Sequence, residues 1–151
     1  MNLILSHDKY NINHIYYSDS IKNTVIEHSD FAKVLFSNDD LYLNGVYLLI
    51  NFHDVSMETY YNKYKCIINT EKNTNMFKFL YKLEHDILHK YNAHKNKKLI
   101  IQNQLKQGNI KLFIEDSNVS KKYNSVQFLL KISGIWDKGN EIGLTYKFIM
   151  L

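Results

Sequence analysis

Two segments near the end of the chain alternate between apolar and polar residues, and this alternation constrains the fold more than any other feature. They are Ser125–Asp137 and Ile142–Met150, joined by a glycine-containing turn at residues 138–140. Successive side chains of a β-strand point to opposite faces, so each segment has one apolar face and one mixed face. Two such runs around a glycine turn predict an antiparallel hairpin.

The position of Trp136, the only tryptophan, depends on one glycine in this hairpin. Strict alternation places Trp136 on the apolar face, which is the default for a lone tryptophan. A β-bulge at Gly134 shifts the register by one residue and moves Trp136 to the mixed face, beside Lys131 and Lys147. The sequence leaves both positions open.

Most of the remaining chain also has the pattern of strands, and one segment differs. Asn75–Ala93 has apolar residues every three or four positions, which is typical of an amphipathic helix. Strands on both sides of a single long helix predict an α+β domain with a mainly antiparallel sheet. The other predicted strands are Ile12–Tyr17, Phe31–Ser37, Leu41–His53 with a bend at Gly45, Glu58–Asn69 and Ile110–Glu115.

The length of 151 residues fits one domain, which we expect to comprise residues 31–151, with residues 1–30 as an arm or covering segment. The single cysteine, Cys66, excludes a disulfide framework within the chain and favours a reducing compartment. The sequence has no apolar run as long as a membrane span and no signal-peptide pattern. We therefore expect an intracellular protein without a membrane partner.

The charges are unevenly distributed along the chain. Residues 1–60 contain three lysines and eight acids, whereas residues 61–151 contain sixteen lysines and seven acids. Clustered positive charge is typical of a protein with a polyanionic partner, and solubility alone is the alternative explanation. All 19 basic residues are lysine, so the bidentate fork with which arginine reads guanine is absent. Base-specific recognition of duplex DNA is therefore not expected, and the abundance of lysine and asparagine is typical of an AT-rich genome.

Two mixed strand faces combine lysines with aromatic residues, which suits single-stranded nucleic acid because bases stack on aromatic rings and lysines follow the phosphates. The simpler interpretation is that the tyrosines favour strand structure and the lysines protect an edge. Both interpretations stay open. The predicted binding residues are Tyr61, Lys63, Lys65, Lys131, Trp136 and Lys147, with Lys121 and Lys122 attracting the ligand from a loop.

The pattern LKISGIW followed by GLTYKF, between Leu130 and Phe148, resembles the C-terminal hairpin of small single-stranded-nucleic-acid-binding proteins of large DNA viruses. The resemblance implies an OB-like fold, a partly open oligonucleotide-binding barrel in which a helix lies between the third and fourth strands. It also implies a viral protein that binds single-stranded DNA or RNA in the host cytoplasm or nucleus. It implies no particular binding residue.

The sequence contains no strong catalytic or metal-binding signature. His85 and His89 in HDILH resemble the zinc-protease motif HExxH, but Asp86 replaces the glutamate and Lys78 and Lys82 lie on the same helix face. We expect exposed histidines without a metal, and a buried structural thiol in the Cys66 strand. Phosphate-loop, dinucleotide and serine-esterase motifs are absent, so we expect a protein that is not an enzyme and has no cofactor.

An alternative is a non-enzymatic protein–protein interaction or structural module of a virus, which would use its aromatic-rich sheet to bind a protein partner. Either kind of protein could form a homodimer or a higher oligomer.

Overall fold

The computed structural model describes residues 4–60, 63–112 and 121–151. Its architecture is a mainly antiparallel sheet with one long helix, which confirms the predicted α+β class. No helix among the described residues is both long and apolar enough to cross a membrane. The strands are β1 (Leu5–Ser6), β2 (Ile15–Tyr17), β3 (Ile21–Lys22), β4 (Asp30–Ser37), β5 (Tyr42–Leu43), β6 (Val46–Tyr60), β7 (Lys63–Ile68), β8 (Asn96–Lys98), β9 (Asn109–Leu112), β10 (Lys122–Asp137) and β11 (Glu141–Met150). The helices are α1 (Thr74–Tyr91), α2 (Ile100–Lys106) and three short 3₁₀ turns, η1 (His7–Lys9), η2 (Ile12–His14) and η3 (Glu71–Asn73).

Strand β10 is the centre of the sheet. Its first part pairs with β6 and its last residues pair with β4, both on one edge, while β11 occupies the other edge. The main path through the sheet is β2-β4-β10-β6-β7-β9, and within the described residues the two end strands do not pair to close a barrel. The long strands therefore form one continuous sheet around β10.

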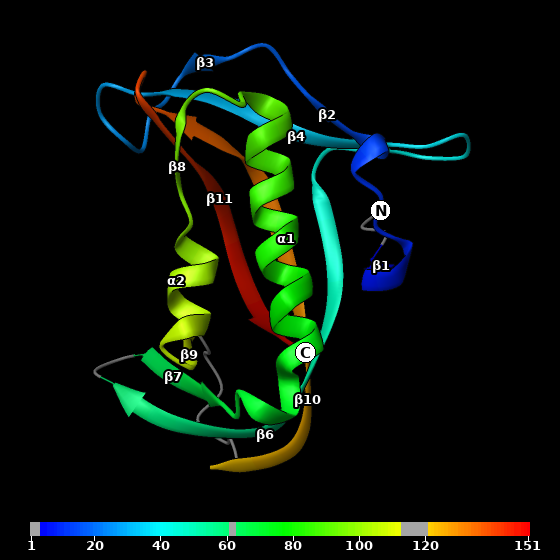
Figure 1. The fold of residues 1–151 in the computed structure, drawn as a ribbon, viewed down its shortest axis with the longest axis vertical. Coiled ribbons are helices and arrows are strands. Elements are labelled where there is room, and N and C mark those ends of the chain that lie inside the picture. Colours follow the sequence, from blue (N-terminus) through cyan, green and yellow to red (C-terminus); the bar gives the residue numbers. More distant parts are fainter. Residues whose placement is uncertain (1–3, 61–62, 113–120) are drawn as a thin grey trace.

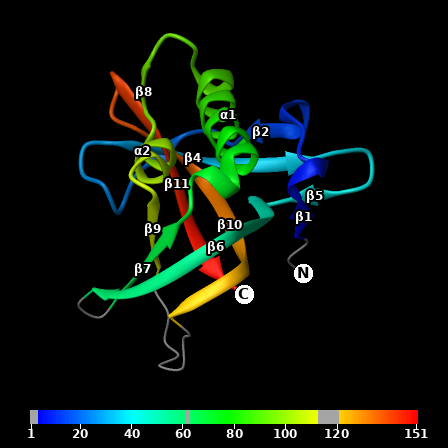
Figure 2. The same cartoon turned by 60° about the horizontal axis from the view of Figure 1, so that its bottom comes forward.

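Helix α1 lies along one side of this sheet, lengthwise over β10 and β11 (Figures 1 and 2). Its buried apolar residues recur at the predicted helical spacing and join one core cluster with residues of β4, β6, β7, β9, β10 and β11. The predicted helix is thus confirmed, two residues shorter at its end than expected. The buried helix residues are Phe77, Leu80, Leu83, Glu84, Ile87 and Leu88.

We call the face of the sheet that points away from this core the outer face.

Residues 12–17 lie against α1. Lys90 Nζ donates hydrogen bonds to the carbonyl oxygens of Ile12 and Ile15, at 2.9 and 2.7 Å, and the Tyr17 hydroxyl donates to the carbonyl of Ile87. The predicted strand at Ile12–Tyr17 is partly wrong, because its first half is the turn η2 and only the second half forms β2.

Two other predicted strands have different limits in the structure. The segment Glu58–Asn69 is not one strand: Glu58 to Tyr60 end β6, and β7 then returns antiparallel to it. The predicted strand Leu41–His53 is divided by Gly45, which has a φ of 134°, into the short β5 and the beginning of β6. The glycine bend is confirmed, and β6 continues well beyond the predicted end.

Helix α2 has no counterpart among the predicted elements, and its beginning depends on a distant side chain. The carboxylate of Glu84, which is completely buried on α1, accepts hydrogen bonds from the backbone N–H groups of Ile101 and Gln102 at 2.9 and 3.0 Å. These donors are among the N–H groups that have no partner within a helix. Glu84 therefore joins the two helices. Its own sequence neighbourhood contains no sign of this role.

The pKa of the Glu84 carboxyl gives a test of this contact. Burial raises this pKa above its usual 4.5, although hydrogen bonds from the backbone of Gln102, Ile101 and Ile100 favour the ionised form. The folded protein therefore holds a proton that the unfolded chain has lost, and stability falls as pH rises from about 4.5 through the raised pKa. E84Q cannot ionise and should lack this contribution. Urea unfolding across this pH range should show wild type losing stability relative to E84Q, whereas a constant difference would contradict the assignment.

Candidate nucleic-acid interface

The predicted residues Lys131 and Lys147 lie directly opposite each other on the outer face, in the register of β10 and β11. Tyr47 on β6 is the partner of Lys131 on its other side, so the three side chains form one row across three strands. Lys131 Nζ lies 5.7 Å from the centre of the Tyr47 ring, within the range of a cation–π interaction. Lys147 is exposed, and Lys131 and Tyr47 are half-buried. An aromatic ring beside two lysines is thus present. It belongs to Tyr47, which was not among the predicted binding residues.

A second pair of lysines has the same arrangement at the far end of the sheet. Lys65 on β7 lies directly opposite Lys111 on β9, and Glu58 on β6 is the neighbour of Lys65 on its other side. Lys63 is exposed on the same face of β7. Among the described residues, no carboxylate oxygen lies within 4 Å of Nζ of Lys65, Lys111 or either lysine of the first pair. Like charges directly opposite on neighbouring strands are destabilising, so the two pairs need an explanation beyond packing.

The structure does not bring all the predicted residues into one site. Lys121 and Lys122 are exposed at the beginning of β10, where Lys122 is the register partner of Ser56. About 30 Å of extended strand separates Lys122 from Lys131. The lysines thus form two groups on the outer face, connected by β10. Tyr61 lies outside the described residues.

Trp136 occupies the alternative position that depends on a bulge. The register of β10 against β11 shifts between Ile132 and Gly134, which turns Trp136 to the outer face, opposite Gly143. Trp136 nevertheless remains only 6% exposed. A Cβ on Gly143 would lie 2.2 Å from Cζ2 of the indole, so the ring rests directly on the backbone of β11. A base cannot stack on a ring buried in this way, and Trp136 is therefore a packing residue of the outer face in this structure.

Phe31 and a further lysine complete this part of the outer face. Phe31 on β4 is the register partner of Trp136, and its ring covers Gly134, where a Cβ would lie 2.4 Å from Cζ. Lys33, the register partner of Gly134, is exposed on the same face. Neither Lys33 nor Lys111 was predicted, because one sequence alone does not define the strand pairing that places Lys111 opposite Lys65 and Lys33 opposite Gly134.

The other chemical groups considered in the sequence do not form a site. His85 and His89 are both exposed, and their rings are stacked with centres 5.4 Å apart. Asp86 accepts a hydrogen bond from Lys82 Nζ. The described residues contain no group of three or more side chains that could hold a metal ion. Cys66 is fully buried, and this burial raises the pKa of its thiol to about 12, so it is protonated near neutral pH.

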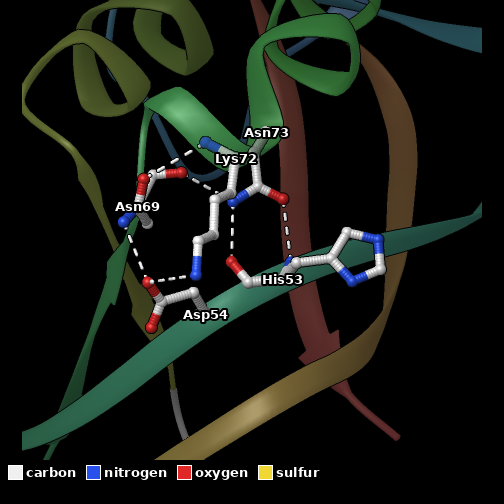
Figure 3. A network of polar contacts seen from close by, with 5 residues as sticks. All are labelled: His53, Asp54, Asn69, Lys72 and Asn73. Atoms are coloured by element: carbon white, nitrogen blue, oxygen red, sulfur yellow. Dashed lines mark hydrogen bonds and ion pairs between the residues drawn. The ribbon is translucent and has the colours of Figure 1, made fainter.

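A polar network beside the beginning of α1 has a structural role (Figure 3). The side-chain amide of Asn73 accepts from the backbone N–H of His53 at 2.8 Å and donates to its carbonyl at 2.7 Å. It replaces a neighbouring strand at a point of β6 that β7 does not reach. Asp54, with a φ of 54°, accepts from the Asn69 amide and lies 3.5 Å from Lys72 Nζ, and these partners hold the pKa of its carboxyl below the usual value.

Comparison with known proteins adds no relative, because no protein-family model, curated protein or solved structure matches the chain. What the chain binds is therefore inferred from the geometry of the outer face.

The contact between Trp136 and Gly143 can be tested by adding one methyl group. G143A places a Cβ within the indole, so we expect a loss of about 1–3 kcal/mol in the free energy of unfolding. Tryptophan emission should shift to longer wavelength as the ring is displaced toward water. The matched control is T145A, exposed on the same face of β11, with an expected change within about 0.5 kcal/mol. Equal stability of the two variants would contradict the described packing.

Proposed function

We propose that this chain is a sequence-tolerant single-stranded nucleic-acid-binding protein of viral origin, and not an enzyme. The observation that carries the proposal is the presence of two directly opposed lysine pairs, Lys131 with Lys147 and Lys65 with Lys111, on the outer face. In the free protein the two ammonium groups of each pair repel each other. A phosphate placed between them would remove that repulsion. A polyanion is therefore the kind of partner that fits this face.

The surroundings of the first lysine pair support a single strand as the partner. Tyr47 lies beside Lys131, where a base could stack on its half-buried ring while phosphates follow the lysines. The next row of the outer face consists of Leu49, Leu129 and Ile149, which are half-buried and apolar. Unpaired bases have apolar faces that can lie on such a row, whereas the bases of a duplex are stacked on one another.

An OB-like architecture is part of the proposal. The order of the longer strands supports it, since β4, β6 and β7 precede α1 and β9, β10 and β11 follow. The helix also packs on the inner face of a curved antiparallel sheet that is open, as in a partly open barrel.

Removal of the first lysine pair tests the proposal. Fluorescence anisotropy with a labelled oligothymidine of twelve nucleotides should show roughly 10-fold weaker binding by K131A/K147A than by wild type. If two phosphate contacts are lost, the slope of log affinity against log salt should become less steep by about 1.4. The matched control K9A/K78A removes two exposed lysines from η1 and α1 and should bind like wild type. Equal affinity and equal salt slope for the two double variants would exclude the proposed face.

A protein–protein interaction module is the second candidate, favoured by an exposed apolar region. A hollow of about 280 Å³ is lined by Ile21, Val25, Ile26 and Phe31 among others, and Val25 is 88% exposed. Exposed apolar patches often mark protein interfaces. Size-exclusion chromatography with light scattering distinguishes the candidates, because a stable oligomer that is indifferent to oligothymidine favours this second function.

A further inference from the structure

One hollow on the outer face has mainly apolar walls. It lies between the loop that joins β3 to β4 and the strands β4 and β11, and its volume is about 280 Å³. We call it the apolar hollow. Its lining includes Ile21, Asn23, Val25, Ile26, Phe31 and Thr145.

The register of the strands places the apolar hollow among lysines of the outer face. Phe31 is the register partner of Ile21 on β3 and of Trp136 on β10, so these side chains form one row across three strands. Lys147 lies on the same face of β11 as Thr145, about 7 Å further along the strand. The row next to Phe31 consists of Lys33, Gly134 and Thr145. Lysines on β4 and β11 are thus near neighbours of the hollow.

Local hydrogen bonds shape the loop side of the apolar hollow. Asn23 Oδ1 accepts from the backbone N–H groups of Val25 and Ile26, at 2.9 and 3.2 Å. The backbone N–H of Asn23 donates to the carbonyl of Ser29 at 2.9 Å, and the Ser29 hydroxyl donates to the carbonyl of Ile26 at 2.7 Å. These bonds use the oxygen of the Asn23 side-chain amide. Among the described residues its NH₂ group is bonded to no acceptor, so the lining includes a donor that a ligand can use.

We propose that the apolar hollow binds one unpaired base of a nucleic-acid strand. A base is flat, has apolar faces and carries acceptor atoms on its edges, so it can lie against Phe31 and accept from the Asn23 NH₂ group. Ile21 and Val25 are 61% and 88% exposed, and a base would remove part of this apolar surface from water. The inference rests on the proposed binding of single strands and adds a site for a base.

The size and surroundings of the hollow favour a base over a protein segment. Its volume is near the lower end of small-ligand sites, about 300 Å³, whereas a stable protein interface buries about 800 Å² on each partner. A nucleotide joins an apolar-faced base to a charged phosphate, and the hollow has exposed Lys33 and Lys147 nearby. Glu27 in the same loop is exposed and does not line the hollow. The apolar walls therefore suit the base, and the two lysines suit its neighbouring phosphates.

Photocrosslinking tests where a base lies. A set of oligothymidines of twelve nucleotides, each with iodouracil in place of one thymine, is irradiated in complex with wild type. Trypsin cleaves after lysine, so residues 23–33, which include the loop and Phe31, form one peptide, and Tyr47 lies in a separate peptide of residues 34–63. Mass spectrometry should find a crosslink in residues 23–33. Crosslinks in other peptides alone would overturn the inference.

Two opposite changes measure how much the hollow contributes to binding. I21A/V25A removes two exposed apolar walls, and T145L fills the hollow from the exposed side of β11. Each should weaken binding of oligothymidine roughly 10-fold in anisotropy titrations, because the contact with one base is lost. The slope of log affinity against log salt should stay the same, since no phosphate contact is removed. The control I4A removes an exposed apolar side chain near the beginning of the chain and should bind like wild type.

The two proposals fail in different ways. If wild type binds oligothymidine and both I21A/V25A and T145L keep its full affinity, the base site is overturned and single-strand binding remains. No binding by wild type overturns both. If light scattering shows an oligomer for wild type and a monomer for I21A/V25A with unchanged affinity for oligothymidine, the hollow is an interface between copies of the chain, which also overturns the base site.

Discussion

Helix α1 packs against one face of the sheet, and this packing decides which side chains of the strands point outward. The apolar residues of the helix and of its neighbouring strands, among them β4, β6, β7, β9, β10 and β11, enter a single cluster, so each of these strands must direct its other face outward. Lysines that alternate with core residues are therefore gathered on one continuous surface, although they lie far apart in the sequence. The charge of the outer face is a consequence of how the core is buried.

The shift of register between Ile132 and Gly134 divides the outer face into two regions. Before the shift, Lys131, its β6 neighbour Tyr47 and its β11 neighbour Lys147 are exposed or half-buried on this face. After the shift, Trp136 is turned outward and then buried on the backbone of Gly143. One extra residue in a strand thus explains why the only tryptophan is neither part of the core cluster nor free to stack.

Much of the fold could be predicted from the sequence because alternation and helical spacing are local patterns. Phe31–Ser37 and the helix beginning near Asn75 were predictable for this reason. Features that depend on distant partners were not. Helix α2 begins on the buried carboxylate of Glu84, and Lys111 joins Lys65 only through the pairing of β7 with β9. The sequence therefore predicted Lys65, Lys131 and Lys147 as surface lysines but did not predict Lys111. Their grouping into two opposed pairs depends on the register of the sheet.

If the opposed lysines suit a polyanion, they should lower the stability of the free protein, and the protein should gain stability when a polyanion binds. Thermal unfolding of wild type and K147E, with and without the oligothymidine of twelve nucleotides, tests this most directly. An opposite charge facing Lys131 should stabilise the free variant by up to about 1 kcal/mol, which raises Tm by up to roughly 4 °C. Oligothymidine should raise the Tm of wild type and have a much smaller effect on K147E. A variant no more stable than wild type, with the same increase on addition of oligothymidine, would contradict the account.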